Sequence, residues 1–287
     1  MMMIKSPLRY PGGKSRAIKQ IEEQLPNDFS EYREPFVGGG SVFIYLKQVY
    51  PNVKIWINDL NPELYLFWKI AQSDLKMLVT ELKAIKKNRK DGRELFTELS
   101  QVDVQKMSDF DRAVRFFVLN RITFSGTIES GGYSDKSFHS RFTESSIDRV
   151  ERLGDLLPEI RITNLDYREV VKQEGENTFI FLDPPYLTAT KSKLYGKNGN
   201  LHTSFNHQDF AETMKQCDHQ WLITYDEAQE IRNYFQDHTI IPWKLQYGMN
   251  NYKQGKAEKG QEIFIRNYQQ EKPIPKSQQL SLNLNIC

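Results

Sequence analysis

The segment Asp183-Pro184-Pro185-Tyr186 directly follows the most apolar run of the chain, residues 179–182. Each proline holds its φ at about −65° and has no backbone N–H, which predicts a stiff turn with outward-facing carbonyl oxygens. A carboxylate, such a carbonyl and an aromatic ring can together receive a planar base. The two oxygens accept the hydrogens of an exocyclic amino group, and the ring stacks on the base. The alternative is an ordinary turn after a strand.

A second chemical pattern is the triple glycine of residues 38–40, which follows Phe36 where a strand is expected to hand over to a helix. Glycine lets the backbone approach a ligand closely, and a helix amino terminus favours polar or anionic groups. Asp59 ends the next expected strand, where an acid can bind the ribose hydroxyls of an adenine-containing cofactor. The alternative is a tight turn with a surface acid.

The third pattern, Gly12-Gly13-Lys14-Ser15, raises the question of a triphosphate-binding loop. That loop requires a further glycine five positions before the one that precedes the lysine, and Leu8 stands there. Too few residues precede it for the buried strand that feeds such a loop. This reading is excluded, and the segment is interpreted as a basic turn.

These residues must be positioned by strands and helices. Short apolar runs alternate with helical patterns along the chain, which predicts a doubly wound α/β sheet. The expected strands lie in residues 34–40, 53–59, 161–166, 177–182, 220–224, 238–243 and 261–267. The expected helices of this part lie in residues 41–50, 167–173, 207–217 and 226–236.

The pattern changes in residues 63–158, where apolar stripes at helical spacing replace the strand runs. One stripe lies in residues 75–85 after Ser73, the expected N-cap, and another in residues 114–118. We therefore predict a mostly helical inserted domain at 63–158 and a sheet domain formed by 1–62 and 159–268. Residues 269–287 are predicted to be a C-terminal tail.

Composition sets the class of protein. The chain has 287 residues, of which 39% are hydrophobic, enough for a packed core. No apolar run approaches a membrane span or a signal core, and Cys217 and Cys287 form no CxxC pair, which predicts a reduced, cytoplasmic protein. The five histidines lack metal-ligand spacing, so we expect no metal. The net charge of +2 is small, but basic residues cluster in 83–93 and at Lys191, Lys193 and Lys197.

Five segments occur in an order that resembles the Dam-type (D12 class) DNA adenine N6-methyltransferases. They are RYPGGK (9–14), EPFVGGGSVF (34–43), NDLNPEL (58–64), RFFVLNR (115–121) and FLDPPY (181–186). The resemblance covers about residues 6–268. It implies S-adenosylmethionine as methyl donor, a Rossmann-like catalytic domain and an inserted helical target-recognition domain.

The resemblance also implies roles for individual residues. The cofactor-binding residues are then Tyr10, Lys14, Phe36, Gly38, Gly40, Asp59, Asp166 and Asp183. The catalytic residues are Asp183, Pro184, Pro185 and Tyr186. The target adenine is flipped onto Tyr186, and Asp183 with the Pro184 carbonyl aims its N6 amino group at the methyl carbon, without a metal. Related N4-cytosine enzymes usually have serine in place of Asp183, so this residue favours adenine.

Recognition of duplex DNA is expected in residues 120–142, which combine glycine turns with polar and basic side chains. The candidates that contact phosphates, read base edges or wedge into the base stack are Arg121, Thr127, Tyr133, Lys136 and Arg141. The alternative is a surface loop. This segment departs from the GATC-specific version of the family after LNR, so the target sequence stays open. A monomer is expected, and a cognate restriction endonuclease is a candidate partner.

Three other functions remain as alternatives. A DNA-binding protein of the same fold without catalysis is disfavoured by the intact DPPY and glycine motifs. A methyltransferase acting on RNA or on a protein amide is the second, although protein-amide enzymes typically have Asn-Pro-Pro-Tyr. A nicotinamide dehydrogenase is the third, and it leaves DPPY unexplained.

Overall fold

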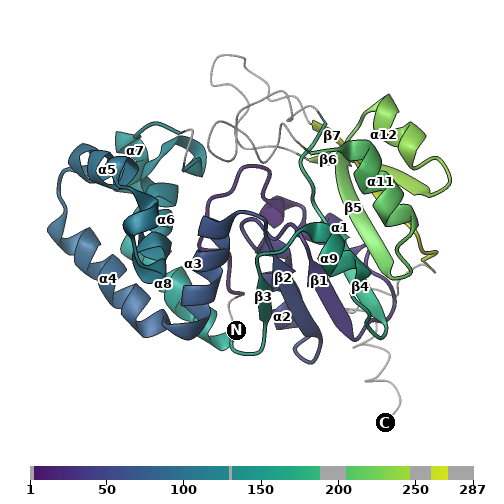
Figure 1. Ribbon diagram of the computed structural model, residues 1–287, viewed down its shortest axis with the longest axis horizontal. Coiled ribbons are helices and arrows are strands. Elements are labelled where there is room, and N and C mark those ends of the chain that lie inside the picture. Colours follow the sequence, from purple (N-terminus) through teal and green to yellow (C-terminus); the bar gives the residue numbers. More distant parts are fainter. Residues whose placement is uncertain (1–2, 129–130, 188–204, 246–259, 271–287) are drawn as a thin grey trace, which may run out of the picture.

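The protein is described by a computed structural model for residues 3–128, 131–187, 205–245 and 260–270 (Figure 1). Within these residues, strands form one sheet in the order β3-β2-β1-β4-β5-β7-β6. Their bounds are β1 Glu31–Glu34, β2 Lys54–Asn58, β3 Arg161–Thr163, β4 Thr178–Leu182, β5 Gln220–Asp226, β6 Thr239–Leu245 and β7 Gly260–Arg266. Strands β1 to β5 pair in parallel, and β7 is antiparallel to both β5 and β6.

The strand order reverses between β1 and β4. The chain builds β1, β2 and β3 in one direction and then returns to place β4 on the other side of β1. The loops that leave β1 and β4 therefore diverge, which opens a crevice at the carboxyl ends of these strands. The predicted doubly wound, Rossmann-like α/β fold is confirmed.

Helices cover both faces of the sheet (Figure 1). Side chains of β4 alternate, so that Phe179 and Phe181 join one core cluster while Ile180 and Leu182 join the other. The first face packs against helices α1 (Ile18–Glu22), α2 (Ser41–Val49) and α3 (Pro62–Ser73). The second packs against α9 (Tyr167–Lys172), α11 (His207–Lys215) and α12 (Gln229–Tyr234).

Between α3 and β3 the elements of the described chain are helices, and they lie to one side of the sheet (Figure 1). They are α4 Leu75–Asn88, α5 Gly92–Gln101, η2 Val104–Lys106, α6 Asp109–Ile122, η3 Phe124–Gly126, α7 Asp135–Arg141, α8 Glu144–Glu151 and η4 Arg152–Asp155. An isolated bridge joins Thr123 and Tyr133. Helix α3 links this part to the sheet, because Phe67 stacks on Phe117 of α6 while Trp68 packs on Phe43 of α2.

Two local predictions were wrong. The first strand ends at Glu34, where we expected it to begin. Two of its three buried residues, Arg33 and Glu34, are charged, so the strand gives no apolar run. Ser73 is the last residue of α3 rather than an N-cap, and Asp74 separates α3 from α4. The start of α3 itself has a clear signal, since Asn61 accepts hydrogen bonds from two backbone N–H groups and Pro62 follows it.

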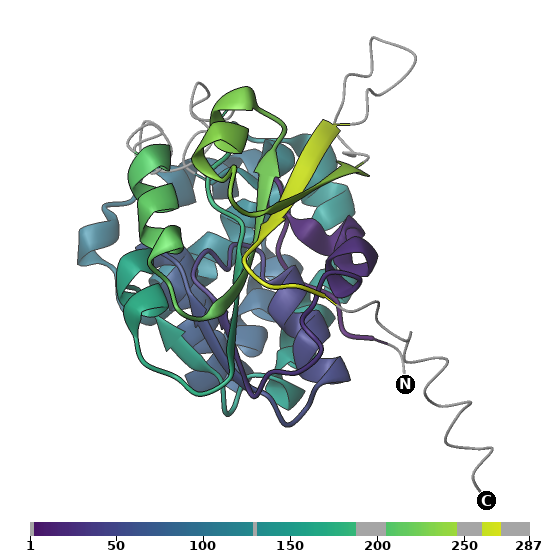
Figure 2. The same ribbon diagram turned by 90° about the vertical axis from the view of Figure 1, so that its right-hand side faces the viewer.

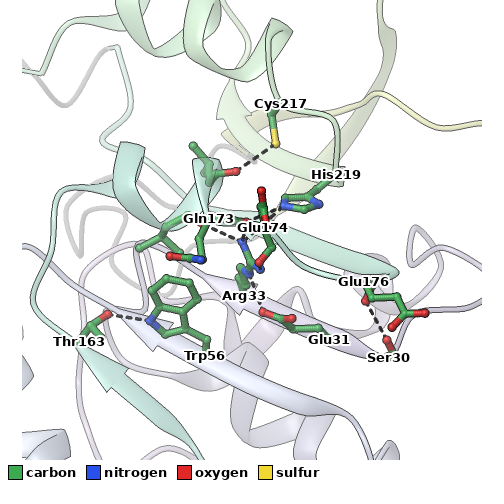
Figure 3. A network of polar contacts seen from close by, with 12 residues as sticks. Ser30, Glu31, Arg33, Trp56, Thr163, Gln173, Glu174, Glu176, Cys217 and His219 are labelled. Atoms are coloured by element: carbon green, nitrogen blue, oxygen red, sulfur yellow. Dashed lines mark hydrogen bonds and ion pairs between the residues drawn. The ribbon is translucent and has the colours of Figure 1, made fainter.

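The polar strand β1 is stabilised by a buried arginine network (Figure 3). Arg33 is only 1% exposed, and its guanidinium donates to the carbonyls of Val170 at 2.9 Å and Glu174 at 2.8 Å, and to the Glu31 carboxylate at 2.6 Å. The same side chain lies over the ring of Trp56. Arg33 therefore provides hydrogen-bond donors for carbonyl groups at the end of α9 and in the loop before β4. These bonds fix the end of the sheet that lies opposite the crevice.

Candidate active site

A cavity of about 420 Å³ lies at the switch point between β1 and β4. Its walls come from the loops that follow β1, β2, β3 and β4 and from the segment before α1. Every residue predicted to be cofactor-binding or catalytic lines it: Tyr10, Lys14, Phe36, Gly38, Gly40, Asp59, Asp166, Asp183, Pro184, Pro185 and Tyr186. The volume is in the range of small-ligand sites.

The RYPGGK segment forms a tight turn on this wall. The Gly13 N–H donates to the Tyr10 carbonyl at 3.0 Å, and Gly12 has a φ of +71°, which favours glycine. Lys14 begins the 3₁₀ helix η1 (Lys14–Arg16), and its ammonium, buried in the wall, donates to the Gly12 carbonyl at 2.9 Å. The same ammonium lies 2.8 Å from Oδ1 of Asp183, so the turn delivers a cation to the acid of the DPPY segment.

The glycine turn after β1 needs its glycines. Gly38 and Gly40 have φ values of +47° and +69°, and a Cβ on Gly38 would lie 3.0 Å from the Tyr10 ring. Asp59 reaches across from the end of β2, and its two oxygens accept the N–H groups of Gly38 and Asn61, each at 3.0 Å. Burial raises the pKa of Asp59 to about 6, although both backbone hydrogen bonds lower it.

The DPPY segment is held by side chains from neighbouring strands. Oδ1 of Asp183 accepts the Thr224 hydroxyl at 2.7 Å as well as Lys14. The Tyr186 hydroxyl donates to Glu262 at 2.7 Å, and its ring lies 6.0 Å from that of Tyr225 at an angle of 30°. The acid and the ring are therefore fixed before any ligand enters.

Asp166 lies at the far end of the cavity, where it caps α9. Its carboxylate accepts the Arg168 N–H at 2.9 Å, and the Arg168 guanidinium bridges it to Asp209. Beside it, the Phe36 ring lies 5.4 Å from Tyr167 and 5.9 Å from Phe205, which gives an aromatic wall. This end of the cavity combines a flat apolar surface with a carboxylate, as a purine ring requires.

Sequence reasoning missed two acids and one hydroxyl group that lie in or behind the wall of the site. Glu34 lies in the cavity wall, where it accepts the Tyr32 hydroxyl at 2.7 Å and the Phe43 N–H at 3.0 Å, and burial raises its pKa to about 8. Thr224 and Glu262 hold the DPPY segment from β5 and β7. The one available signal was a charged residue within an otherwise apolar strand run, as at Glu262.

The residues predicted to contact DNA divide into two groups. Lys136 and Arg141 are exposed on α7, and Tyr133 lies beside them, 4.9 Å from the Arg93 guanidinium. Arg121 and Thr127 are buried, which does not support direct contact with DNA for these two. The Arg121 Nε donates to the Arg141 carbonyl at 3.0 Å, and burial followed by repulsion from Arg9, Arg149 and Arg141 lowers its pKa to about 9.

An unexpected feature of the same segment is Phe124, whose side chain is 69% exposed. It precedes Ser125, which has a φ of +59°. The segment is docked onto the amino-terminal segment that precedes η1, since Asn120 exchanges hydrogen bonds with the N–H and carbonyl of Arg9 at 2.9 and 2.6 Å. An exposed aromatic ring thus lies two residues before Gly126, which packs against the Arg9 backbone.

Several predictions fall outside the described residues or concern other ligands. Lys191, Lys193, Lys197 and most of the C-terminal tail, from residue 271, lie outside them. Within the described ranges, no group of three His, Cys, Asp or Glu side chains is arranged to hold a metal ion. No helix in these ranges is long and apolar enough to cross a membrane.

Comparison with known proteins adds independent evidence. Residues 10–249 match the family model described as D12 class N6 adenine-specific DNA methyltransferase. The chain is 28% identical over 232 residues to the Type II methyltransferase M.MjaIII of Methanocaldococcus jannaschii, a match that covers 73% of this chain and 76% of that protein. It is 24% identical over 279 residues to M1.LlaDCHI of Lactococcus lactis subsp. cremoris, covering 91% and 94%. The DNA adenine methylase of Vibrio cholerae is 23% identical over 205 residues, covering 67% and 70%.

Proposed function

Since this chain belongs to the D12 class N6 adenine-specific DNA methyltransferases, we propose that the cavity between β1 and β4 is where it transfers a methyl group from S-adenosylmethionine to an adenine of duplex DNA. The observation that supports this is the convergence of the glycine turn, Asp59, Asp166 and the DPPY segment on one cavity. These residues come from four separate loops, and a purely structural role gives no reason for them to meet.

The residues present fit S-adenosylmethionine. The glycine turn lines the cavity, and a Cβ at Gly38 would lie 3.0 Å from the ring of Tyr10, which lines the same wall. Asp59 would accept the ribose hydroxyls, because each of its oxygens accepts one backbone N–H and keeps a lone pair. Phe36 and Asp166 would take the adenine ring and its amino group.

The chain's own part in the reaction is to place the acceptor. When bound, S-adenosylmethionine supplies an electrophilic methyl group on a sulfonium sulfur. Oδ1 of Asp183 is bonded to Lys14 and Thr224, so we assign Oδ2 and the Pro184 carbonyl as acceptors for the adenine N6 amino group. These bonds favour a pyramidal nitrogen, whose lone pair is no longer delocalised into the ring and points at the methyl carbon. The Asp183 charge stabilises the positive charge that develops on nitrogen as the carbon–sulfur bond breaks. Tyr186 stacks on the flipped base.

Mass spectrometry of nucleosides tests this function directly. Unmethylated DNA is incubated with the protein and S-adenosylmethionine, with RNA and protein offered in parallel. N6-methyladenine in the DNA is expected. N4-methylcytosine would contradict the assignment of Asp183, methylated RNA or protein would contradict the substrate, and a bound cofactor with no product would favour a DNA-binding protein without catalysis.

The affinity for the cofactor is expected to fall as Asp59 takes up a proton. Its pKa of about 6 means that the carboxylate is ionised at pH 7.5 and protonated at pH 5, whereas an ordinary aspartate stays ionised over this range. Protonation weakens charge-assisted hydrogen bonds to ribose hydroxyls, so Kd should rise by about tenfold between these pH values. Calorimetric titration with S-adenosylhomocysteine at the two pH values measures this change in Kd.

Asp59→Asn is the control, since it has no proton to gain. This variant should bind weakly at both pH values with little change between them. A pH dependence that persists in Asp59→Asn would assign the effect to another group of the site.

On the DNA side, we propose that Phe124 fills the gap that a flipped adenine leaves in the duplex. Its ring is exposed and lies on the segment that docks on Arg9, beside the RYPGGK turn. Burial, followed by repulsion from the exposed Arg141, lowers the pKa of Arg9, so Arg141 adds positive charge near this segment. An apolar wedge offsets part of the unstacking cost of base flipping.

Phe124→Ala is therefore expected to lower kcat/KM for DNA by about 10-fold to 100-fold and to leave cofactor affinity unchanged. Fluorescence of 2-aminopurine at the target position reports base flipping and should decrease in the variant. Met77→Ala removes another exposed apolar side chain, on α4, and serves as the control. Equal losses in both variants would place Phe124 outside the interface.

We further propose a monomer that acts within a restriction–modification system. Relatives such as M.MjaIII and M1.LlaDCHI are named Type II methyltransferases, and the described residues hold both the cavity and the exposed recognition segment in one chain. A restriction endonuclease with the same target sequence is the partner that such a system requires. Sequencing of DNA methylated by the protein gives that target.

A further inference from the structure

Strand β7 places a buried acid behind the DPPY segment. Glu262 is 1% exposed, and its Oε2 accepts the Tyr186 hydroxyl at 2.7 Å. It lies beyond residues 10–249, the part of the chain that matches the family model. Figure 2 shows β7, in yellow, beside the green strands with which it pairs.

The register of the sheet explains how β5 and β7 act on the same segment. Asp226 of β5 pairs with Glu262 of β7, and Thr224 pairs with Phe264, so Thr224 and Glu262 lie on one face of neighbouring strands. Thr224 bonds Asp183 and Glu262 bonds Tyr186. The first and last residues of the DPPY segment are thus held from two adjacent strands.

Lys14 joins these two contacts electrostatically. Its ammonium is 2.8 Å from Asp183 and lies 4.8 Å from the centre of the Tyr186 ring. Burial raises the pKa of Glu262 to about 7, while Lys14 and the Tyr186 hydrogen bond lower it and Asp183 and Asp226 raise it. A buried carboxylate is costly to retain, and at Glu262 it is bonded to the ring that the proposed function assigns to the target base.

We propose that Glu262 is a positioning residue for methyl transfer: its hydrogen bond to the Tyr186 hydroxyl fixes the plane of the ring on which the flipped adenine stacks. This inference rests on the proposed function. Tyr186 has two rotatable side-chain bonds, and the hydroxyl contact at the far end of the ring restricts both. A ring that is free to tilt no longer presents the N6 amino group to Asp183 in one orientation, which lowers the rate of the chemical step rather than binding.

A double-mutant cycle tests this coupling. Tyr186→Phe keeps the ring and removes the hydroxyl, and Glu262→Leu removes the acceptor. Each is expected to lower kcat by about 10-fold, with KM for S-adenosylmethionine and DNA changed less than about threefold. Both variants break the contact between Tyr186 and Glu262, and Tyr186→Phe also removes the contact of its hydroxyl with Thr224. The double variant Tyr186→Phe/Glu262→Leu should therefore be no slower than Tyr186→Phe alone. Glu262→Gln still offers a carbonyl acceptor and should recover kcat to within about threefold of the wild type.

Two matched controls separate this role from loss of stability. Glu262 has one oxygen bonded to Tyr186, and its Oε1 has no hydrogen-bond partner among the described residues. Glu63 is also buried and matches it: Oε1 accepts the Arg112 Nε at 3.1 Å, and Oε2 has no such partner in the described chain. Tyr268, also buried, donates its hydroxyl to the Gln24 carbonyl away from the cavity. Glu63→Leu and Tyr268→Phe should lower the unfolding temperature without changing kcat at a temperature where they are folded.

The possible results distinguish a failure of the proposed function from a failure of the positioning role of Glu262. Wild-type protein that forms no N6-methyladenine overturns the proposed function and this inference with it. Active wild-type protein with losses that multiply in the double variant, with wild-type kcat in Glu262→Leu, or with Glu262→Gln as slow as Glu262→Leu overturns the positioning role alone. Tyr186→Phe is a conservative change, so a wild-type kcat in this variant overturns the positioning role even where Glu262→Leu does not fold.

Discussion

Asp183→Ala is expected to abolish methyl transfer, with kcat reduced by about 1,000-fold or more, while S-adenosylmethionine still binds. Under the proposed function, Asp183 both orients the amino group and stabilises the charge that develops on nitrogen. The glycine turn, Asp59 and Asp166 remain in place in the variant, because none of them is bonded to Asp183. Single-turnover methylation and calorimetric cofactor titration measure the two effects separately.

The alanine variant also leaves the buried Lys14 ammonium without its carboxylate, which costs about 3 to 5 kcal/mol of stability. Asp183→Asn separates this effect from catalysis, since the amide oxygen still accepts Lys14 and Thr224. It should fold more stably than Asp183→Ala and be comparably inactive. Turnover near that of the wild type in Asp183→Asn would remove Asp183 from the reaction.

Gly40→Ala should destabilise the fold and disrupt the cavity together. Gly40 has a φ of +69°, and a Cβ there would lie 2.4 Å from Phe43 and 2.7 Å from Trp68, both of which are fully buried rings. The unfavourable backbone conformation and the overlap should lower the free energy of unfolding by about 2 to 5 kcal/mol. Chemical denaturation measures this loss, and cofactor titration should show weaker binding because the turn must shift.

Gly132→Ala is the matched control, because a Cβ at that position meets nothing within 4 Å. It should keep the stability and the cofactor affinity of the wild type. A Gly40→Ala variant as stable as Gly132→Ala would mean that the Phe43 and Trp68 rings move aside easily, contrary to close packing around the turn.

The sequence was sufficient to predict the fold class and the position of the cavity. Runs such as residues 179–182 are buried on both faces and therefore apolar throughout, and the motifs at their carboxyl ends mark the crevice. The family resemblance is confirmed by the match over residues 10–249. The assignment of individual residues to the cofactor and to catalysis stays a prediction, supported by their convergence on one cavity. The assignment of residues to DNA contact also stays a prediction, and the burial of Arg121 and Thr127 does not support it for these two.

What escaped prediction depends on contacts between distant parts of the chain. Strand β1 was misplaced because Arg33 and Glu34 are buried by polar partners, which hydrophobic periodicity does not register. Glu262 lies 76 residues from Tyr186, and only the pairing of β5 with β7 brings it to the ring. Arg121 was expected to contact DNA because it lies in the polar, glycine-containing residues 120–142, but the fold buries it, and its Nε donates to the Arg141 carbonyl.

The adjacent aromatic residues of α3 connect the two halves of the molecule. Phe67 stacks on Phe117 of α6, the helix that leads into the recognition segment, while the Trp68 indole donates to the Gly38 carbonyl at 3.3 Å. A displacement of α3 therefore moves the recognition helix and the glycine turn at once. Binding of duplex DNA to the helical part should then be thermodynamically linked to binding of the methyl donor in the cavity. Each ligand should change the dissociation constant of the other by the same factor.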